Sequence, residues 1–489
     1  MTDSDWLFAR SLDRRRKEAL HRQLYRAIHD AILDGVLAPG ARLPSTRSFA
    51  EDLGVSRNTV LQAVEQLIAE GFLQGRSGSG TFVAQTLPGN LSKARPRQVG
   101  GAPRRGRRLS ERGKRLMRLP VHWGGEPVPA RPFMPGVPAL EKIPRRILTR
   151  LVTRQAALSR AEEWSYGSSL GALDLREAVS RYLARARGVQ CDPSRILIVE
   201  GSQQGLDLIA RVLLDPGDRV WVEDPGYRGA RHAFFAAGAD VDPRPVDNEG
   251  MMLPSNEPAS PRLIYVTPSN QFPLGGALSA GRRLELLAMA QRHRAWIVED
   301  DYDSEFRYSG APLPALSQLD HDERVLYLGT FSKTIAPSLR LGFLVLPEDL
   351  VEPFAKARVV TGEHAPTFWQ GVLAAFLEEG HFARHVRRMR KLYASRLEVL
   401  VEAAEKELCD WITLGHHEAG LHVVGWLREG LDDRAVSEAA SQRGLVTYPV
   451  SMFRMRPKGR PGLLLGYACL DEAAIRRGAR ELRAVLEAM

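Results

Sequence analysis

The feature that most limits how this chain can fold is an alternation of apolar runs and helix-like segments after residue 130. The apolar runs are short and rich in β-branched and aromatic residues, as strands are: RILIVE, DRVWVED, RLIYVTP, AWIVEDD and VLYLGT. Strands that alternate with helices along a chain form a mostly parallel sheet with helices on both faces. The sequence therefore predicts an α/β domain for most of the chain.

A basic stretch divides the 489 residues, which are too many for one core. From Thr86 to Arg118 there are eleven basic residues and one acid, a net charge of +10 that equals the formal charge of the whole chain. Proline, glycine and arginine dominate, which predicts a flexible linker, either a solvated spacer or an arm that contacts DNA phosphates. We expect a first domain at 1–85, the linker at 86–128 and a second domain at 129–489.

Composition narrows the setting of the protein. A pI near 9.7 makes nucleic acid a reasonable partner. The three cysteines are far apart and form no CxxC pair, which argues for a reducing compartment and against a disulfide framework or a metal site. No apolar run is long enough to cross a bilayer, and the first residues do not read as a signal peptide. These features predict a cytoplasmic protein without a membrane partner.

The first 85 residues contain a helix-turn-helix pattern. Ser45 can cap a helix that stops at Leu53–Gly54, and Ser56 can cap a second one that runs to about Glu70. The second helix of such a motif enters the major groove of DNA by its N-terminal residues. The string FLQGRSGSGTFV then alternates around a turn, as the β-hairpin of a wing does. A small helical bundle that contacts protein is the alternative, but the wing and its basic tips favour DNA.

This region resembles the winged-helix domain of the GntR regulators, in ILDGVLAPGARLPSTRSFAEDLGVSRNTV and AEGFLQGRSGSGTFV. The resemblance implies a recognition helix that faces the operator and a wing near the minor groove. The residues expected at DNA are Arg47, Ser56, Arg57, Asn58, Thr59, Ser77 and Gly78.

Lys333 lies in a Thr-Phe-Ser-Lys loop after a strand-like run, among apolar or small neighbours. A lysine is usually a solvated surface charge, but one in a partly dry site has a lowered pKa and can form a Schiff base with an aldehyde. Pyridoxal phosphate is such an aldehyde. It needs a carboxylate at its pyridinium nitrogen, and hydroxyls, backbone N–H groups and an arginine at its phosphate.

The chain offers each of these groups. Asp300 and Tyr302 are two apart at a strand end and share one face, so we expect them at the ring nitrogen and the phenolic oxygen, while Asp301 points away. Tyr227 follows a strand and can stack on the ring. The other expected contacts are Ser202, Gln203, Thr330 and Arg340 at the phosphate, and Asn270 at the phenolic oxygen or the imine. Each has an ordinary structural role as its alternative, but the whole set favours a cofactor site.

From about residue 130 to the end, the chain resembles the fold-type I aminotransferases, and as a whole it resembles the MocR subfamily of GntR regulators. The supporting strings are PGVPAL, EDPGYRGAR, TPSNQFPLG, EDDYDSEFRY, GTFSK and EEGHFARHVRRMRKLY. The resemblance implies a head-to-tail homodimer in which Lys333 binds pyridoxal phosphate. It also implies that Tyr166, in WSYGSSLG, reaches the phosphate of the neighbouring subunit.

Two departures from the aminotransferase pattern affect function. Leu464, in PGLLLGYA, stands where working aminotransferases usually carry an arginine that binds the substrate carboxylate, so ordinary transamination is in doubt. Arg460 is a nearby substitute, and Arg228, beside Tyr227, could bind an effector anion or form a structural salt bridge. Asn270 stands where many relatives have histidine.

Three functions compete on these residues. The first is a pyridoxal-phosphate-dependent transcriptional regulator that senses the cofactor itself, an amine or an amino acid, and is at most a weak transaminase. The second is an active aminotransferase with an accessory DNA-binding module. The third is a DNA-binding protein whose large domain is only a dimerisation scaffold. The complete set of cofactor contacts favours the first, and the effector stays open.

Overall fold

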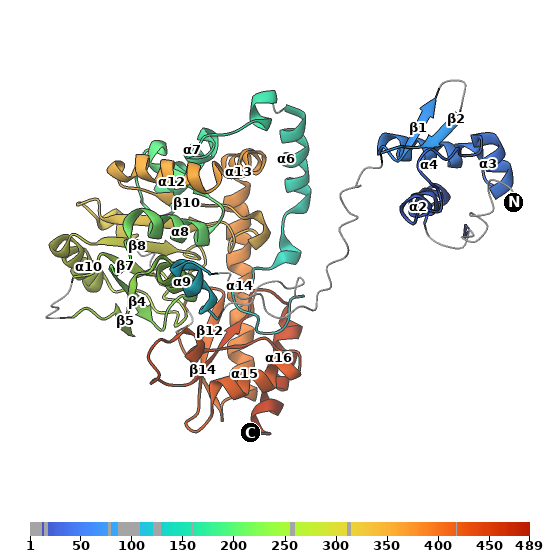
Figure 1. Ribbon diagram of the computed structural model, residues 1–489. Helices are drawn as coiled ribbons and strands as arrows, with labels where there is room; N and C mark the ends of the chain where they lie inside the picture. The colour runs from blue at the N-terminus through green and yellow to red at the C-terminus, as the bar shows by residue number, and fades with distance from the viewer. Residues whose placement is uncertain are drawn as a thin grey trace. The chain divides into compact units, whose positions relative to one another are not determined.

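The computed structural model divides into two compact units, Met1–Arg107 and Arg108–Met489 (Figure 1). The expected wing residues Ser77 and Gly78 lie outside the described residues. In the part that is described, no helix is long and apolar enough to cross a membrane. The structure describes residues 12–13, 18–76, 80–86, 108–120, 129–158, 160–254, 260–310, 314–416 and 418–489.

The first unit contains the predicted winged helix-turn-helix. Its elements are α2 (Leu20–Leu33), α3 (Thr46–Leu53), α4 (Arg57–Ala69), β1 (Leu73–Arg76) and the antiparallel β2 (Gly80–Val83). Apolar residues from all three helices form one core, with Leu24, Phe49 and Val60 almost completely buried. The buried residues of α4 anchor the helix in this core, and its first turn remains exposed.

Serine caps set the starts of α3 and α4, as the sequence predicted. The Ser45 Oγ accepts a hydrogen bond from the Ser48 N–H at 3.1 Å, and α3 ends at Gly54, which has a φ of 61°. The Ser56 Oγ likewise accepts from the Thr59 N–H at 3.2 Å. Glycine takes a positive φ without strain, so the turn between the two helices is defined by local chemistry.

Removing the first cap should loosen α3. We expect Ser45→Ala to cost about 1 kcal/mol, because the Ser48 N–H loses its acceptor. Hydrogen-exchange mass spectrometry of the full chain should show α3 amides exchanging about fivefold faster. Ser48→Ala, which changes an exposed serine inside the same helix, is the control and should not accelerate exchange. Equal protection in both variants would contradict the capping role.

The second unit is built on an eight-stranded sheet of order β3-β10-β9-β8-β7-β4-β5-β6. The pairs from β9 through β8, β7 and β4 to β5 are parallel, and β10 is antiparallel to both of its neighbours. The predicted mostly parallel sheet is therefore confirmed. The strands are β3 (Ile196–Val199), β4 (Arg219–Asp224), β5 (Asp240–Asp247), β6 (Gly250–Met251), β7 (Leu263–Val266), β8 (Trp296–Asp301), β9 (Val325–Thr330) and β10 (Gly342–Val345).

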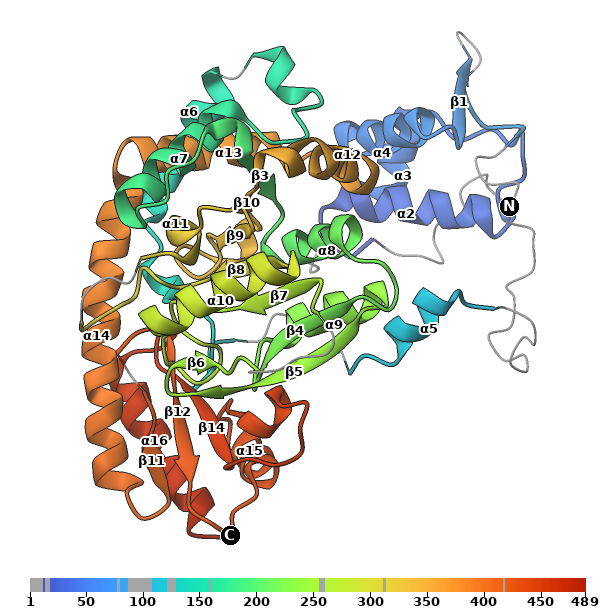
Figure 2. The same cartoon turned by 90° about the vertical axis from the view of Figure 1, so that its left-hand side faces the viewer.

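Helices cover both faces of this sheet (Figures 1 and 2). On one face lie α8 (Ser202–Leu213), α9 (Arg228–Ala237) and α12 (Val351–Gly362), which share one apolar core with Val298 of β8. On the other lie α7 (Leu173–Ala186), α10 (Ala280–His293) and α13 (Thr367–Glu378), with α6 (Arg145–Leu158) packed on α13; Ile297 of β8 faces this side. Successive strand residues point to opposite faces, so Asp300 and Asp301 also face opposite sides.

A smaller antiparallel sheet follows the 27-residue helix α14 (His381–Glu407). Its order is β11-β12-β14-β13, and it packs on α14 and on two further helices. The elements are β11 (Ile412–Leu414), β12 (His422–Leu427), α15 (Asp433–Gln442), β13 (Tyr448–Pro449), β14 (Gly462–Gly466) and α16 (Glu472–Leu486). The short α11 (Leu316–Leu319) precedes β9.

Part of the predicted flexible linker, 86–128, is helical. Helix α5 (Glu111–Met117) is capped by Ser110, whose Oγ accepts from the Gly113 N–H at 3.1 Å. It belongs to the second unit and packs on α9. The sequence pattern concealed this helix, because its stability comes from the cap and from docking rather than from an apolar stripe of its own.

Candidate functional site

Lys333 follows β9 in a largely buried position. Its Nζ donates a hydrogen bond to the backbone oxygen of Gly136 at 2.7 Å. Burial lowers the pKa of the Lys333 ammonium, while the carboxylates of Asp303 and Asp300 oppose that shift. A lowered pKa increases the fraction of neutral amine, which is the form that attacks an aldehyde.

Asp300 lies at the end of β8, and only one of its two carboxylate oxygens accepts a hydrogen bond within the described residues. Its Oδ2 accepts a hydrogen bond from the Tyr265 hydroxyl at 2.6 Å, but its Oδ1 is buried and has no hydrogen-bond partner in the described part of the chain. Burial, and then the charge of Asp301, raises the pKa of Asp300 to about 7. A buried acceptor without a donor is costly. The protonated ring nitrogen of pyridoxal phosphate is a donor that fits this position.

A hydrogen-bonded cluster lies next to Asp300 and Lys333. It consists of Asn270, Tyr302 and Asp303. The Asn270 Nδ2 donates to the Tyr302 hydroxyl at 3.1 Å and to Asp303 at 2.9 Å, while the Tyr302 hydroxyl donates to the Asn270 backbone oxygen at 3.0 Å. Asp303 is 1% exposed, and burial raises its pKa well above the usual range. Asn270 thus orients the tyrosine proposed for the phenolic oxygen.

The start of α8 can receive an anion. Gly201 is its N-cap, with a φ of 88°, and Ser202 opens the helix. The Arg340 guanidinium lies 3.3 Å from the place where a Cβ on Gly201 would be, and its Nη2 donates to the Glu200 backbone oxygen at 2.8 Å. Free N–H groups at a helix N-terminus beside an arginine suit a phosphate. The Thr330 Oγ1 at the end of β9 accepts from the Ser332 N–H at 3.2 Å.

Tyr227 and Gln203 link the starts of α8 and α9. The Tyr227 ring packs edge-on against Phe272 at 5.7 Å, and its hydroxyl donates to the Gln203 Oε1 at 3.5 Å. The Gln203 Nε2 donates to the Gly229 backbone oxygen at 3.0 Å. The amide nitrogen of Gln203 is therefore engaged with α9 in this structure, and its contact with a phosphate stays a prediction.

Two further predicted site residues make other contacts in this structure. Tyr166 is 81% exposed and contacts only the edge of His364, at 6.2 Å, among the aromatic rings of the described residues. Arg228 donates from its Nη2 to the Pro120 backbone oxygen at 2.9 Å and forms no ion pair with any described acid. The structural salt bridge considered for Arg228 is thus not found among the described residues, and its effector role stays a prediction.

Leu464 is completely buried, in an apolar cluster with Val424, Val450 and Phe453. Phe272, which also contacts Tyr227 and Tyr302, packs against this cluster. Arg460, the possible substitute, instead places its guanidinium over the Trp426 ring at 5.6 Å. The wall beside the candidate cofactor site is therefore apolar where an anion-binding arginine would be needed.

The candidate DNA-binding surface lies at the start of α4. Arg57 and Asn58 are exposed in its first turn, whereas the hydroxyls of Ser56 and Thr59 are hydrogen-bonded to each other at 2.9 Å. The Arg47 side chain on α3 is 83% exposed, and its Nε lies 3.5 Å from the Glu51 Oε1. Arg57 and Asn58 are therefore free to reach base edges, while Ser56 and Thr59 also hold the helix start together.

Sequence reasoning missed three residues that support the site: Gly136, Tyr265 and Asp303. Asp303 follows Tyr302 in the EDDYDS motif, and a buried acid beside a lysine could have been suspected there. Tyr265 lies in the predicted strand RLIYVTP, but its bond to Asp300 depends on β7 pairing with β8, which one sequence does not reveal. Gly136 lies in the string PGVPAL, but its contact with Lys333 could not be predicted because the two residues are far apart in the chain.

The fold and this site define an aminotransferase-like, pyridoxal-phosphate-binding domain joined to a winged-helix DNA-binding domain. The model of aminotransferase class I and II matches residues 140–482, and that of the bacterial regulatory proteins of the gntR family matches residues 20–83. The chain therefore belongs to the MocR-type transcriptional regulators of the GntR family.

Relatives and solved structures agree with this assignment. The chain is 43% identical to the "Probable rhizopine catabolism regulatory protein MocR" of Rhizobium meliloti, over 98% of this chain and 96% of that protein. It is 34% identical to the regulator TauR of Rhodobacter capsulatus, over 96% of each. A kynurenine aminotransferase of Pyrococcus horikoshii superposes with a TM-score of 0.68 at 29% identity, covering 73% of this chain and 90% of that one.

A second solved structure carries a covalent cofactor adduct. It is LysN, the α-aminoadipate aminotransferase of Thermus thermophilus, in complex with N-(5'-phosphopyridoxyl)-L-leucine. The TM-score is 0.67 at 30% identity, with 73% of this chain and 92% of that chain covered. Together with the unpartnered oxygen of Asp300, this similarity identifies pyridoxal phosphate as the cofactor.

Replacing Asp300 with asparagine should stabilise the cofactor-free chain increasingly as the pH rises. Because its pKa is raised to about 7, the folded chain holds a proton that the unfolded chain releases near pH 4. The free energy of unfolding of the wild-type chain therefore decreases as the pH rises from about 4 to about 7. Asp300→Asn has no proton to release and avoids this loss. Urea midpoints of both proteins at pH 5 and pH 7.5 check this. A difference that does not change with pH would contradict it.

Proposed function

We propose that this regulator senses a small molecule at the Lys333 site and passes its occupancy to the DNA-binding unit. The effector is pyridoxal phosphate itself, or an amine or amino acid that reacts with the bound cofactor. Bound at Lys333, the cofactor supplies an electrophilic carbon that exchanges one amine for another. Lys333, Asp300 and Tyr302 would hold its ring, and Ser202, Gln203, Thr330 and Arg340 its phosphate.

The observation that favours a sensing role over a catalytic one is that Leu464 is surrounded by apolar side chains. A carboxylate bound there would lose its water and gain no cation, because Val424, Val450 and Phe453 surround the position. Amino-acid substrates would therefore be poorly held. We expect the chain to be at most a weak transaminase. As a regulator, it would use the residues around Lys333 to recognise the effector.

The names of relatives support a small-molecule effector without selecting one. The 43% identical relative is named for rhizopine catabolism, and a regulator of Corynebacterium glutamicum at 32% identity over 93% of each chain is named for pyridoxine biosynthesis. These names point to chemically different signals in one family. An effector for this chain must be identified by experiment.

A route from the cofactor site to the linker is present within the second unit. Tyr227 precedes α9, and the next residue, Arg228, is hydrogen-bonded to the backbone of Pro120. Helix α5, just before Pro120, packs on α9. A ligand that moves Tyr227 would thus act on the segment that leads to the DNA-binding unit. Such coupling requires that the ligand bind two arrangements with different affinities.

We also propose that the chain works as a head-to-tail homodimer in the cytoplasm. Tyr166, Trp164 and Val360 are exposed by 81%, 64% and 86%, so their apolar surface is available to a partner subunit. Tyr166 could then contact the phosphate of a neighbouring subunit. Sedimentation equilibrium of the holoprotein tests this, and a monomer at micromolar concentration would contradict it.

Gel-shift titrations against the DNA upstream of its own gene test the sensing role. DNA binding that changes with pyridoxal phosphate alone would identify the cofactor as the signal. Binding that ignores the cofactor but changes with an amine, an amino acid or taurine would identify that compound class instead. Multiple turnovers with common amino donors would contradict the proposal and favour an active aminotransferase.

A further inference from the structure

A cavity of about 640 Å³ lies on the face of the large sheet opposite Lys333. Its walls are α7, the first turns of α14 and the segment 304–310 after β8. Asp300 faces Lys333, whereas its neighbour Asp301 faces the other side and accepts a hydrogen bond from Arg187 in the cavity wall at 2.8 Å. The cavity is therefore separate from the candidate cofactor site.

The lining of this cavity is strongly basic. Arg181 pairs with Glu378 at 2.5 Å, and Arg307 pairs with Glu418 at 3.1 Å. In contrast, Arg185 and Arg387 have no ion pair or hydrogen bond in the described part of the chain, although both line the cavity. The lining includes the arginines Arg181, Arg185, Arg187, Arg307, Arg387 and Arg390, against the glutamates Glu305 and Glu378.

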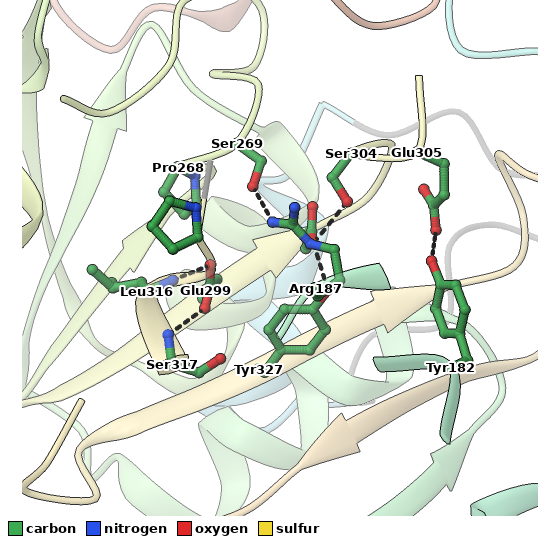
Figure 3. A network of polar contacts seen from close by, with 12 residues as sticks. Tyr182, Arg187, Pro268, Ser269, Glu299, Ser304, Glu305, Leu316, Ser317 and Tyr327 are labelled. Carbon is green, nitrogen blue, oxygen red and sulfur yellow. Dashed lines mark hydrogen bonds and ion pairs between the residues drawn. The ribbon is translucent and has the colours of Figure 1, made fainter. Parts of the chain in front are cut away.

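The inner wall is polar and held by its own hydrogen bonds (Figure 3). The Arg187 Nη2 donates to the Ser269 Oγ at 2.7 Å, and the Ser304 Oγ donates to Asp301 at 2.9 Å. The Tyr182 hydroxyl donates to the Glu305 carboxylate, and burial raises the pKa of Glu305 to about 6. These hydrogen bonds hold the side chains of the inner wall in place, although the Asp301 Oδ1 is buried without a partner in the described part of the chain. A ligand would therefore meet a wall that is already arranged.

Two arginines without acidic partners at a concave site favour an anion. Charge of one sign in a cleft raises the local concentration of oppositely charged ligands, and each guanidinium can bind a carboxylate or a phosphate through two N–H groups. The volume matches that of small-molecule sites in other proteins. Cations are disfavoured by the excess of arginine over glutamate.

We propose that this cavity binds a small polyanion, a molecule with two or more phosphate or carboxylate groups, through Arg185 and Arg387. This site goes beyond the sensing role of Lys333, because it needs neither the amine nor the cofactor. Arg187 and Tyr182 shape its inner end, and Arg390 supports that end by donating from its Nε to the Glu305 backbone oxygen at 2.8 Å.

The test is calorimetric titration of the full-length holoprotein, saturated with pyridoxal phosphate in buffer free of divalent metals. Inorganic pyrophosphate is the probe in one series and citrate in the other. At least one should bind saturably, and Arg185→Gln/Arg387→Gln should weaken it by about tenfold or more, because charged hydrogen bonds are lost. Arg477→Gln/Arg480→Gln removes the same charge from exposed positions on α16 and should not weaken binding.

The two probes separate the sources of the charge. Binding of pyrophosphate alone assigns the site to phosphate compounds, and binding of citrate assigns it to polycarboxylates. Absence of binding by both overturns the proposal, and so does equal binding by wild type and Arg185→Gln/Arg387→Gln. Thermal unfolding checks that the double variant is folded, and if it is not, the single variants Arg185→Gln and Arg387→Gln carry the same expectation.

Discussion

Lys333→Ala is expected to eliminate covalent retention of pyridoxal phosphate and the yellow colour of the purified protein. In the wild-type chain the Lys333 amine is buried beside Asp300 and Asp303, and burial lowers its pKa, which increases the fraction of reactive neutral amine. Lys333 is the only lysine among the described residues of this site. Alanine leaves the carboxylate and the start of α8 unchanged, so weak, non-covalent binding should remain.

Visible absorbance and mass spectrometry after borohydride reduction measure this effect. Lys356→Ala is the matched control, because Lys356 is an exposed lysine of the same unit, ion-paired with Glu352 at 2.6 Å. It should keep wild-type colour and a full cofactor mass increment. A reduced adduct that persists in Lys333→Ala would place the reactive amine elsewhere and remove the basis of the sensing proposal.

The sequence predicted the local features of the fold well, because they depend on nearby residues. The caps Ser45 and Ser56 define their helices through bonds to the next turn, and the five apolar runs became β3, β4, β7, β8 and β9. Strand β5 was missed because Pro243 and Pro245 interrupt its pattern. Helix α5 was missed because its stability comes from docking on α9.

The candidate site was predictable where two residues share one strand, and less so where elements meet. The opposite orientations of Asp300 and Asp301 followed from strand alternation, and the bonds to Tyr265 and Arg187 agree with it. Gly136 could not be found, because its distance to Lys333 depends on how the chain returns over the sheet. The polyanion cavity is another such case, since α7 and α14 are far apart in sequence.

The second large effect is expected at the DNA-binding surface. Arg57→Ala/Asn58→Ala should weaken binding to the specific operator by about 30-fold or more, because each lost base contact costs about 1–3 kcal/mol. Both residues are exposed at the start of α4, and the core of the first unit contains neither, so the variant should fold normally. Arg26→Ala is the control: Arg26 lies on α2, is ion-paired with Glu18, and carries the same charge.

Titrations on operator and on scrambled DNA, at several salt concentrations, separate the two contributions. Loss of Arg57 as a phosphate contact would lower affinity for both DNAs and reduce the salt dependence by about one ion, whereas loss of a base contact would lower operator binding alone. Because Ser56, the N-cap of α4, keeps its hydrogen bond to the Thr59 N–H, the helix itself should stay intact in the variant. Operator affinity equal to that of Arg26→Ala would show that α4 does not read the DNA, and the recognition surface would then have to lie elsewhere in the first unit.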